Sequence, residues 1–128
     1  MTVQLNHTII ASRDPAASAA WLSEMLGLDE PERFGPFWQV STGNGVNLDF
    51  DRRDADDAIT PQHYAFLISD EEFDVIFDRI VDRGIDYYAD PGGTRAGEIN
   101  HNDGGRGVYF PDPDGHWLEI ITRPYGSG

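Results

Sequence analysis

The chain contains an internal repeat, and this repeat limits the folds that it can adopt. His7 lies in an apolar segment of the first half, and His63 lies near the start of an equivalent segment of the second half. A helix-start aspartate follows each histidine, Asp14 in the first half and Asp70 in the second. Self-similarity of this kind indicates two copies of one supersecondary unit. We therefore expect one domain built from two related modules.

The first half predicts a strand, a helix and then further strands. Asp14 and Pro15 are typical of a helix start, with aspartate at the cap and proline at the first helical position. Gly27 ends that helix, and the turn Gly43-Asn44-Gly45 separates two alternating strands. The strands expected in this half are Val3–Ala11, a short one at Pro31–Phe34, Phe34–Thr42 and Val46–Arg52, and the helix is expected to run to about Leu26.

The second half repeats this order after an acidic linker that ends in proline. Ser69 and Glu72 have the spacing of a capping box. The helix that follows, ended by Gly84, has apolar residues at helical spacing, namely Phe73, Ile76, Phe77 and Ile80. The strands expected here are Gln62–Ser69, Asp86–Ala89, Gly107–Phe110 and His116–Thr122, and a long polar loop, Asp90–Arg106, separates the second from the third.

The order of these elements predicts the α+β class, with two paired βαβββ modules. The last strands of the halves align when Gly45–Asp49 is laid on Gly115–Glu119, so Asp49 and Glu119 are equivalent positions. A chain of 128 residues has the length of a single domain. We expect one domain over residues 1–128, with a first module at about 3–53, a linker at about 54–61 and a second module at about 62–123.

The composition excludes several classes of function. The chain has no cysteine, so a metal ion would have to be bound by His, Asp, Glu or water. Its net charge of −14 argues against a nucleic-acid partner. All nine cationic residues are arginines, which excludes a Schiff-base lysine. No apolar run approaches the length of a membrane span, and we expect a cytoplasmic protein with no membrane partner.

The repeat suggests a metal site. Glu119 lies in an apolar strand, where a carboxylate is costly to bury without a partner. Together with His7 and His63 it would form a 2-His-1-carboxylate triad, which leaves coordination positions open. Fe(II), Mn(II), Ni(II) and Zn(II) are all chemically admissible. Asp49 is a possible fourth ligand or general base, although an aspartate in an alternating strand can also face water.

These features resemble the vicinal oxygen chelate superfamily, which includes glyoxalase I, fosfomycin-resistance enzymes, extradiol dioxygenases and bleomycin-binding proteins. The resemblance rests on the two βαβββ units, a histidine in the first strand of each, and a final Asp-Pro-Asp-Gly-His-x-x-Glu segment at residues 112–119. It implies a U-shaped mixed sheet and a homodimer that acts on a small molecule. The metal ligands of the family fall on His7, His63 and Glu119.

The segment Ile99–Glu119 is similar to the signature of extradiol dioxygenases. The resemblance implies that His101 is the acid–base residue, that Tyr109 donates a hydrogen bond to the substrate, and that the favoured ion is Fe(II). Both roles suit the chemistry of an imidazole and a phenol. The larger extradiol enzymes have a further active-site histidine between the two ligand histidines, and this chain has none between His7 and His63.

Other functions within the resemblance remain open. A glyoxalase-type lyase would use Asp49 as a fourth ligand, but Asp49 is one methylene shorter than the expected glutamate, and Ala11 stands where glutathione would be anchored by arginine. A fosfomycin thiol transferase would need a cationic pocket, which an acidic, lysine-free chain disfavours. An antibiotic-binding protein that confers bleomycin resistance would stack its ligand on aromatic side chains. The candidates for substrate or drug contact are Arg95 and Arg106 in the long loop, Trp38, Trp117, Phe37 and Tyr109.

Overall fold

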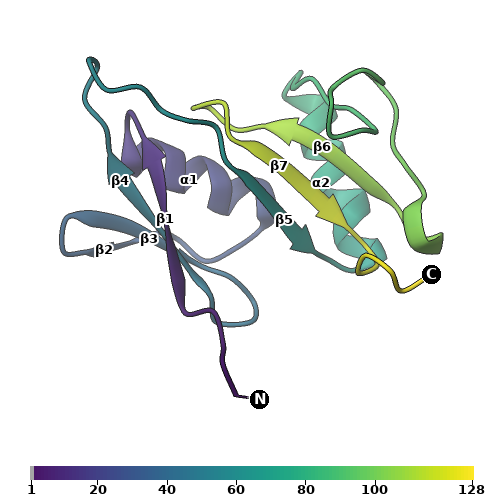
Figure 1. The fold of residues 1–128 in the computed structure, drawn as a ribbon, viewed down its shortest axis with the longest axis horizontal. Coiled ribbons are helices and arrows are strands. Elements are labelled where there is room, and N and C mark those ends of the chain that lie inside the picture. The colour runs from purple at the N-terminus through teal and green to yellow at the C-terminus, as the bar shows by residue number, and fades with distance from the viewer. Residues whose placement is uncertain (1) are drawn as a thin grey trace. The chain divides into compact units, whose positions relative to one another are not determined.

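The protein consists of two compact units, and each is described by itself. The computed structural model describes residues 2–128. One unit ends at Thr60, and the other begins at Pro61. Each has one α-helix and one mixed sheet, of four strands in the first unit and three in the second (Figure 1). The predicted α+β class is confirmed. None of the helices in residues 2–128 combines the length and the apolar character needed to cross a membrane.

The first unit is a four-stranded sheet with one helix. Its elements are β1 (His7–Ser12), α1 (Pro15–Leu26), β2 (Glu32–Phe34), β3 (Phe37–Ser41) and β4 (Asn47–Arg52), and the strand order is β1-β4-β3-β2. The Asp14 carboxylate accepts a hydrogen bond from Ala17 N at 3.2 Å, and Gly27, with φ of 70°, ends the helix. Both predicted helix signals of this half are confirmed.

The first strand is shorter than the sequence suggests. It begins at His7 and not at Val3, because its only partner, β4, begins at Asn47. Helix α1 packs against β3 and β4 through Leu22 and Met25, which are buried. The hydroxyls of Ser12 and Ser18 pair at 2.7 Å beneath this helix, so the short connection between β1 and α1 buries no unsatisfied hydroxyl.

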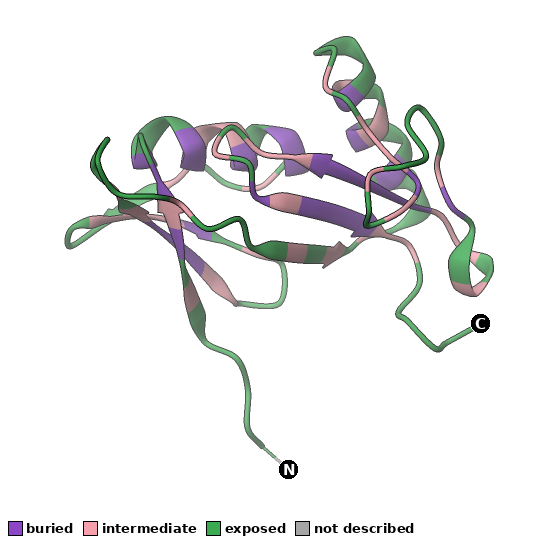
Figure 2. Ribbon diagram, turned by 45° about the horizontal axis from the view of Figure 1, so that its top comes forward, coloured by how far each residue is buried: buried purple, intermediate pink, exposed green. Residues whose placement is uncertain are grey.

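The second unit repeats the arrangement with a smaller sheet. Its elements are β5 (His63–Leu67), α2 (Asp70–Asp82), a 3₁₀ turn (Asn102–Gly104), β6 (Gly107–Pro111) and β7 (Trp117–Ile121), and the strand order is β5-β7-β6. The capping box is complete: Ser69 N donates to Glu72 Oε1 at 2.9 Å, and Glu72 N donates to Ser69 Oγ at 3.1 Å. The apolar face of α2 is buried, as Figure 2 shows for both helices and the central strands.

The strand predicted at Asp86–Ala89 is wrong. Only Tyr88 forms bridges there, one to Ala96 and one to Tyr109. The Asp90 carboxylate accepts hydrogen bonds from the backbone N–H groups of Thr94 and Arg95, at distances of 2.7–3.0 Å. This turn, together with Pro91, bends the chain away immediately after Ala89, and a longer ladder cannot form.

The strand register confirms the repeat. In the first sheet His7 pairs with Asn47, and Ile9 pairs with Asp49. In the second sheet His63 pairs with Trp117, and Ala65 pairs with Glu119. Both pairs of strands are parallel, and in both the histidine lies two residues before the partner of the acidic residue. Asp49 and Glu119 are therefore structurally equivalent.

The capping box provides a test of how the second unit is stabilised. We expect Ser69→Ala to lower the free energy of unfolding by about 1 kcal/mol, because Glu72 N loses its acceptor. Urea denaturation measures the change. Ser69→Thr keeps a hydroxyl at the same position and is the matched control. Equal loss in both variants would show that the hydroxyl contributes nothing to the stability of α2.

Candidate functional site

His63 and Glu119 come together in the second unit. Glu119 lies on β7 and is completely buried, with an exposed fraction of 0%. His63 is the first residue of the neighbouring strand β5, and its Nε2 lies 3.1 Å from Glu119 Oε1. The side chain of His63 is 46% exposed, so the imidazole lies between the buried carboxylate and solvent. Two of the three predicted metal ligands are therefore neighbours.

Strand geometry explains why Glu119 points to this side. Successive side chains of a strand face opposite sides of the sheet, so Leu118 and Ile120 face away from the Glu119 carboxylate, and both are buried. Tyr109 is the register partner of Glu119 on β6. Glu119, Tyr109 and His63 therefore lie on one face of this sheet, while Leu118 and Ile120 lie on the opposite face.

A chain of hydrogen bonds ends at the Glu119 carboxylate. The hydroxyl of Tyr125 donates a short hydrogen bond to Glu119 Oε2. The hydroxyl oxygens of Tyr109 and Tyr125 lie 2.9 Å apart. Because the single proton of Tyr125 points to the carboxylate, its oxygen must accept the proton of Tyr109. Both carboxylate oxygens thus have a polar neighbour, as a buried charge requires.

Both phenols are protonated at neutral pH, and burial extends the protonated form to higher pH. It raises the pKa of Tyr109 above the ordinary value for tyrosine, because a phenolate is poorly solvated there. Burial also raises the pKa of Tyr125, and the hydrogen bond to Glu119 raises it further. At neutral pH both hydroxyls therefore remain donors.

Aromatic rings surround the pair. Tyr109 stacks on His63 with ring centroids 5.8 Å apart, and on Trp117 with centroids 6.0 Å apart. Tyr88 lies on Trp117 at a tilt, 5.3 Å away. Among the residues that the structure describes, Trp117 Nε1 is the one buried side-chain nitrogen or oxygen with no hydrogen-bond partner. Its N–H is thus an unused donor within the aromatic group.

The equivalent residues of the first unit are arranged differently. His7 is exposed, and its Nδ1 lies 2.7 Å from Asn6 Oδ1. Asp49 is only 3% exposed, which excludes the alternative that it faces water. Its Oδ1 accepts a hydrogen bond from Gln39 Nε2 at 2.9 Å. Gln39 is the register partner of Asp49 on β3, as Tyr109 is that of Glu119 on β6, so Asp49 is bonded to a neutral amide and not to an imidazole.

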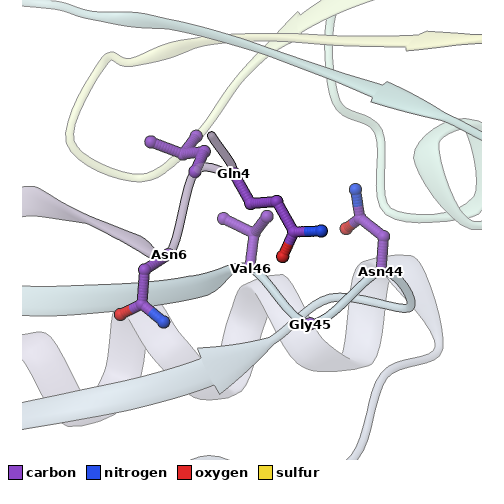
Figure 3. Close-up of a pocket in the computed structure, with 6 residues that line it drawn as sticks. Gln4, Asn6, Asn44, Gly45 and Val46 are labelled. Carbon is purple, nitrogen blue, oxygen red and sulfur yellow. The ribbon is translucent and has the colours of Figure 1, made fainter. Parts of the chain in front are cut away.

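The first unit also contains a polar cavity, and it has no titratable side chain in its lining (Figure 3). The volume of this cavity is 570 Å³. It lies where the segment before β1 passes the turn between β3 and β4, and it is lined by Gln4, Leu5, Asn6, Asn44, Gly45 and Val46. Amide side chains can bind a polar molecule, but they supply neither an acid nor a base, so we do not assign the chemistry to this cavity.

The remaining predicted site residues form their hydrogen bonds, ion pairs and ring contacts with residues other than His63 and Glu119. His101 is exposed at the start of the 3₁₀ turn. Arg95 pairs with Glu98 at 3.4 Å. Arg106 precedes β6, and its side chain packs against helix α2. It forms ion pairs with Asp74 at 2.7 Å and with Asp70 at 3.2 Å, and its guanidinium lies over the Phe73 ring. Trp38, in the first unit, lies under the Arg33 guanidinium.

No three His, Asp or Glu side chains in residues 2–128 form a group that could bind a metal ion. The structure brings together His63 and Glu119, with Tyr109 and Trp117 beside them. The third predicted ligand, His7, and the possible fourth, Asp49, belong to the other unit.

The sequence analysis missed His116, which supports this arrangement. The side chain is fully buried, and its Nδ1 accepts the backbone N–H of Gln62 at 3.0 Å. Because Gln62 precedes His63, this bond fixes the start of β5 against β7. Asp112 accepts the backbone N–H of His116 at 2.8 Å, and burial raises the pKa of this carboxyl. The signal was present in the Asp-Pro-Asp-Gly-His segment, to which the sequence assigned a family resemblance but no role for the histidine.

The buried phenol of Tyr109 predicts a dependence of stability on pH. A raised pKa in the folded state gives stability that is present below the pKa of the unfolded chain, about 10, and is lost as pH rises above it. At neutral pH we expect Tyr109→Phe to cost about 1 kcal/mol through the lost hydrogen bond. Urea denaturation should show that the difference in free energy of unfolding between the wild type and Tyr109→Phe becomes smaller above about pH 10, because only the wild type loses stability when Tyr109 ionises in the unfolded chain. A deficit that stays constant with pH would contradict the prediction.

Several known proteins are similar to this chain in sequence or in fold. Residues 4–120 match the Glyoxalase/Bleomycin resistance protein/Dioxygenase superfamily. The structure of Oxidase ChaP-H2 is 60% identical in sequence, has a TM-score of 0.96, and the match covers 100% of this chain and 99% of that one. Glutathione transferase FosA of Serratia marcescens is 29% identical, over 94% of this chain and 81% of its own length. Metallothiol transferase FosB of Lysinibacillus sphaericus (strain C3-41) is 30% identical, over 95% of this chain and 84% of its own length.

With its repeat, its two mixed sheets and its paired histidine and glutamate, the chain belongs to the Glyoxalase/Bleomycin resistance protein/Dioxygenase superfamily.

Proposed function

We propose that the protein is a metal-dependent oxidase that acts on a small, oxygen-rich aromatic molecule. The ligands in this proposal are His7, His63 and Glu119, and the favoured ion is Fe(II). The observation that supports it best is the buried Glu119 carboxylate beside His63, in a chain that is 60% identical to an oxidase over its whole length. The name of the FosB relative, a metallothiol transferase, supports a metal in the same superfamily.

The His63–Glu119 pair fits a divalent ion chemically. The Nδ1 atom of His63 lies 2.8 Å from Trp117 O, which can only accept, so Nδ1 must be the protonated nitrogen. In the neutral imidazole, Nε2 then directs a lone pair toward the carboxylate oxygen 3.1 Å away. These two lone pairs repel unless a metal ion or a second ring proton lies between them, so the same pair of atoms can bind either.

The chain's own residues have separable roles in this proposal. When bound, the ion supplies Lewis-acid polarisation and open positions for substrate oxygens. Tyr109 stays protonated and donates to a substrate oxygen on which negative charge develops. His101 exchanges a proton with the substrate. Trp117 offers a ring for stacking and an unused N–H donor, while Trp38, Arg95 and Arg106 stay weaker candidates for substrate contact.

We further propose that the protein works as a homodimer. This rests on the resemblance to the superfamily. Size-exclusion chromatography with light scattering would measure the oligomeric state. A monomer that binds metal with full affinity would contradict this part of the proposal.

Thiol transfer, with the fosfomycin substrate that the family resemblance leaves open, is the second candidate, because two relatives near 30% identity are named as a glutathione transferase and a metallothiol transferase. The contacts of the two loop arginines disfavour it. Arg106 already binds Asp70 and Asp74, and Arg95 pairs with Glu98. A phosphonate needs cations whose charge is not neutralised in this way. Incubation with fosfomycin and thiols, followed by mass spectrometry, tests this candidate, and the lyase and drug-binding alternatives are tested with methylglyoxal–glutathione adducts and bleomycin.

The metal proposal predicts one divalent ion per chain. We expect His63→Ala to weaken binding of Mn(II) or Fe(II) by at least about tenfold, since even residues that only support a ligand have effects of that size. Anaerobic calorimetric titration and elemental analysis would measure affinity and stoichiometry. His101→Ala is the matched control, because it removes an exposed histidine that is not a proposed ligand, and its affinity should be unchanged. A lack of stoichiometric metal in the wild-type protein would contradict the proposal.

The oxidase proposal predicts oxygen consumption. Anaerobic protein loaded with Fe(II) and mixed with a panel of catechols should consume O₂ on exposure to air, as an oxygen electrode would record. Loss of a proton-transfer group typically costs about 10²–10⁴-fold in rate, so His101→Ala should lose most of the activity without losing metal. Tyr87→Phe, which changes a ring that packs on Phe77, should keep it. A flat oxygen trace across the panel, together with a thiol adduct of fosfomycin, would favour the transferase.

A further inference from the structure

The C-terminal segment, residues 123–128, places an additional residue at the site. Its tyrosine, Tyr125, donates to Glu119 Oε2 and accepts from Tyr109. Tyr125 is 59% exposed, so apolar burial does not explain its position. It lies after the last repeated strand, β7, and has no counterpart in the first half of the chain. The repeat therefore does not account for its presence at the carboxylate.

The segment is held in place at its end by Asp103. The Oδ1 atom of Asp103 accepts the backbone N–H of Gly126 at 3.1 Å and that of Gly128 at 3.4 Å. Within residues 2–128, Asp103 is the one non-glycine residue with positive φ, at 57°. Aspartate tolerates this conformation better than most residues. Arg123 adds a hydrogen bond from Nη2 to Ser127 O at 3.0 Å, so the backbone around Tyr125 is fixed on both sides.

The two oxygens of Glu119 have different neighbours. Oε1 faces His63 Nε2 at 3.1 Å, and Oε2 receives the proton of Tyr125. An oxygen that accepts a hydrogen bond from a phenol is a poorer metal ligand than one that does not, because one of its lone pairs is already used. One oxygen of the carboxylate therefore faces the histidine, and the other is hydrogen-bonded to the tyrosine.

We propose that Tyr125 is a positioning residue of the metal site, which holds Glu119 Oε2 so that Oε1 alone is presented beside His63 as the ligand oxygen. The inference rests on the proposed function in one respect, that His63 and Glu119 bind the ion. Without the Tyr125 hydroxyl, the carboxylate loses a hydrogen bond that fixes the angle of its plane, and its terminal torsion is broad. A half-turn only exchanges the two equivalent oxygens, but a partial rotation moves an oxygen away from His63 Nε2 and lowers the fraction of chains that are ready to bind.

Removal of one oxygen atom tests this role. Tyr125→Phe keeps the ring and loses the hydroxyl, and we expect its affinity for Mn(II), used as the probe, to fall by about 10–100-fold, the range for residues that orient a metal ligand. Tyr87→Phe removes the same atom from a ring that packs on Phe77, and its affinity should equal that of the wild type. Thermal unfolding of the metal-free variants measures stability separately. Unchanged or tighter binding by Tyr125→Phe overturns the proposal.

A second pair of variants tests the anchor without touching the tyrosine. Asp103→Gly removes the acceptor and still permits positive φ, whereas Asp103→Asn keeps an acceptor oxygen and tolerates the same φ. Weaker Mn(II) binding in the glycine variant, with wild-type binding in the asparagine variant, supports the role of the segment. Equal binding in both overturns it. Wild-type protein that binds no Mn(II) would contradict the proposed function itself and this inference with it, whereas a wild type that binds, with Tyr125→Phe binding equally well, overturns the inference alone.

Discussion

The Glu119 carboxylate is the group on which the second unit depends. It is fully buried between two other strands, and removing a carboxylate from water costs several kcal/mol unless its partners replace the lost solvation. Those partners come from three places in the chain: His63 at the start of β5, Tyr125 beyond β7, and Tyr109 on β6 through Tyr125. A site of this kind is consistent with function, because folding stability alone would be served better by an aliphatic residue in this strand.

The repeat shows how one scaffold produces two different environments. Asp49 and Glu119 occupy the same register position on parallel strand pairs, and both are buried. Asp49 is satisfied by the amide of Gln39, a partner whose charge does not change with pH or with a bound ion. Glu119 is satisfied by an imidazole and a phenol, which can exchange protons and, in the case of the imidazole, bind a metal. The difference between the two halves therefore lies in the partners and not in the backbone.

Much of the fold was predictable because it depends on local signals. The caps of both helices, the turn glycines and the alternating strands each have a mechanism that acts over a few residues, and the equivalence of Asp49 with Glu119 followed from aligning the halves. The strand at Asp86–Ala89 was not predictable, because the side chain of Asp90 forms a turn that ends the ladder. The start of β1 depended on where its partner begins, which is a tertiary effect.

The site residues that lie at repeat-equivalent positions were predictable from the sequence, and the residues outside the repeat were not. His63 and Glu119 followed from the repeat and from the resemblance, whereas His116 was overlooked although it lies in the motif that was recognised. Tyr125 had no signal at all. It lies outside the repeat, in a short glycine-containing segment, and its relation to Glu119 depends on a turn made 22 residues earlier in sequence by Asp103. Residues that support a site from a terminus are therefore the ones that pattern analysis is least able to find.

The hydrogen-bond chain places a constraint on any chemistry at this site. Tyr109 has one hydroxyl proton, and in the structure it goes to Tyr125. If Tyr109 donates instead to a substrate oxygen, Tyr125 loses a donor but keeps its own bond to Glu119, so the position of the carboxylate is maintained while the substrate binds. A phenol that acted on the substrate and held the carboxylate at the same time could not do both with one proton. In the proposed function, two tyrosines in series separate these tasks, with Tyr109 acting on the substrate and Tyr125 holding the carboxylate.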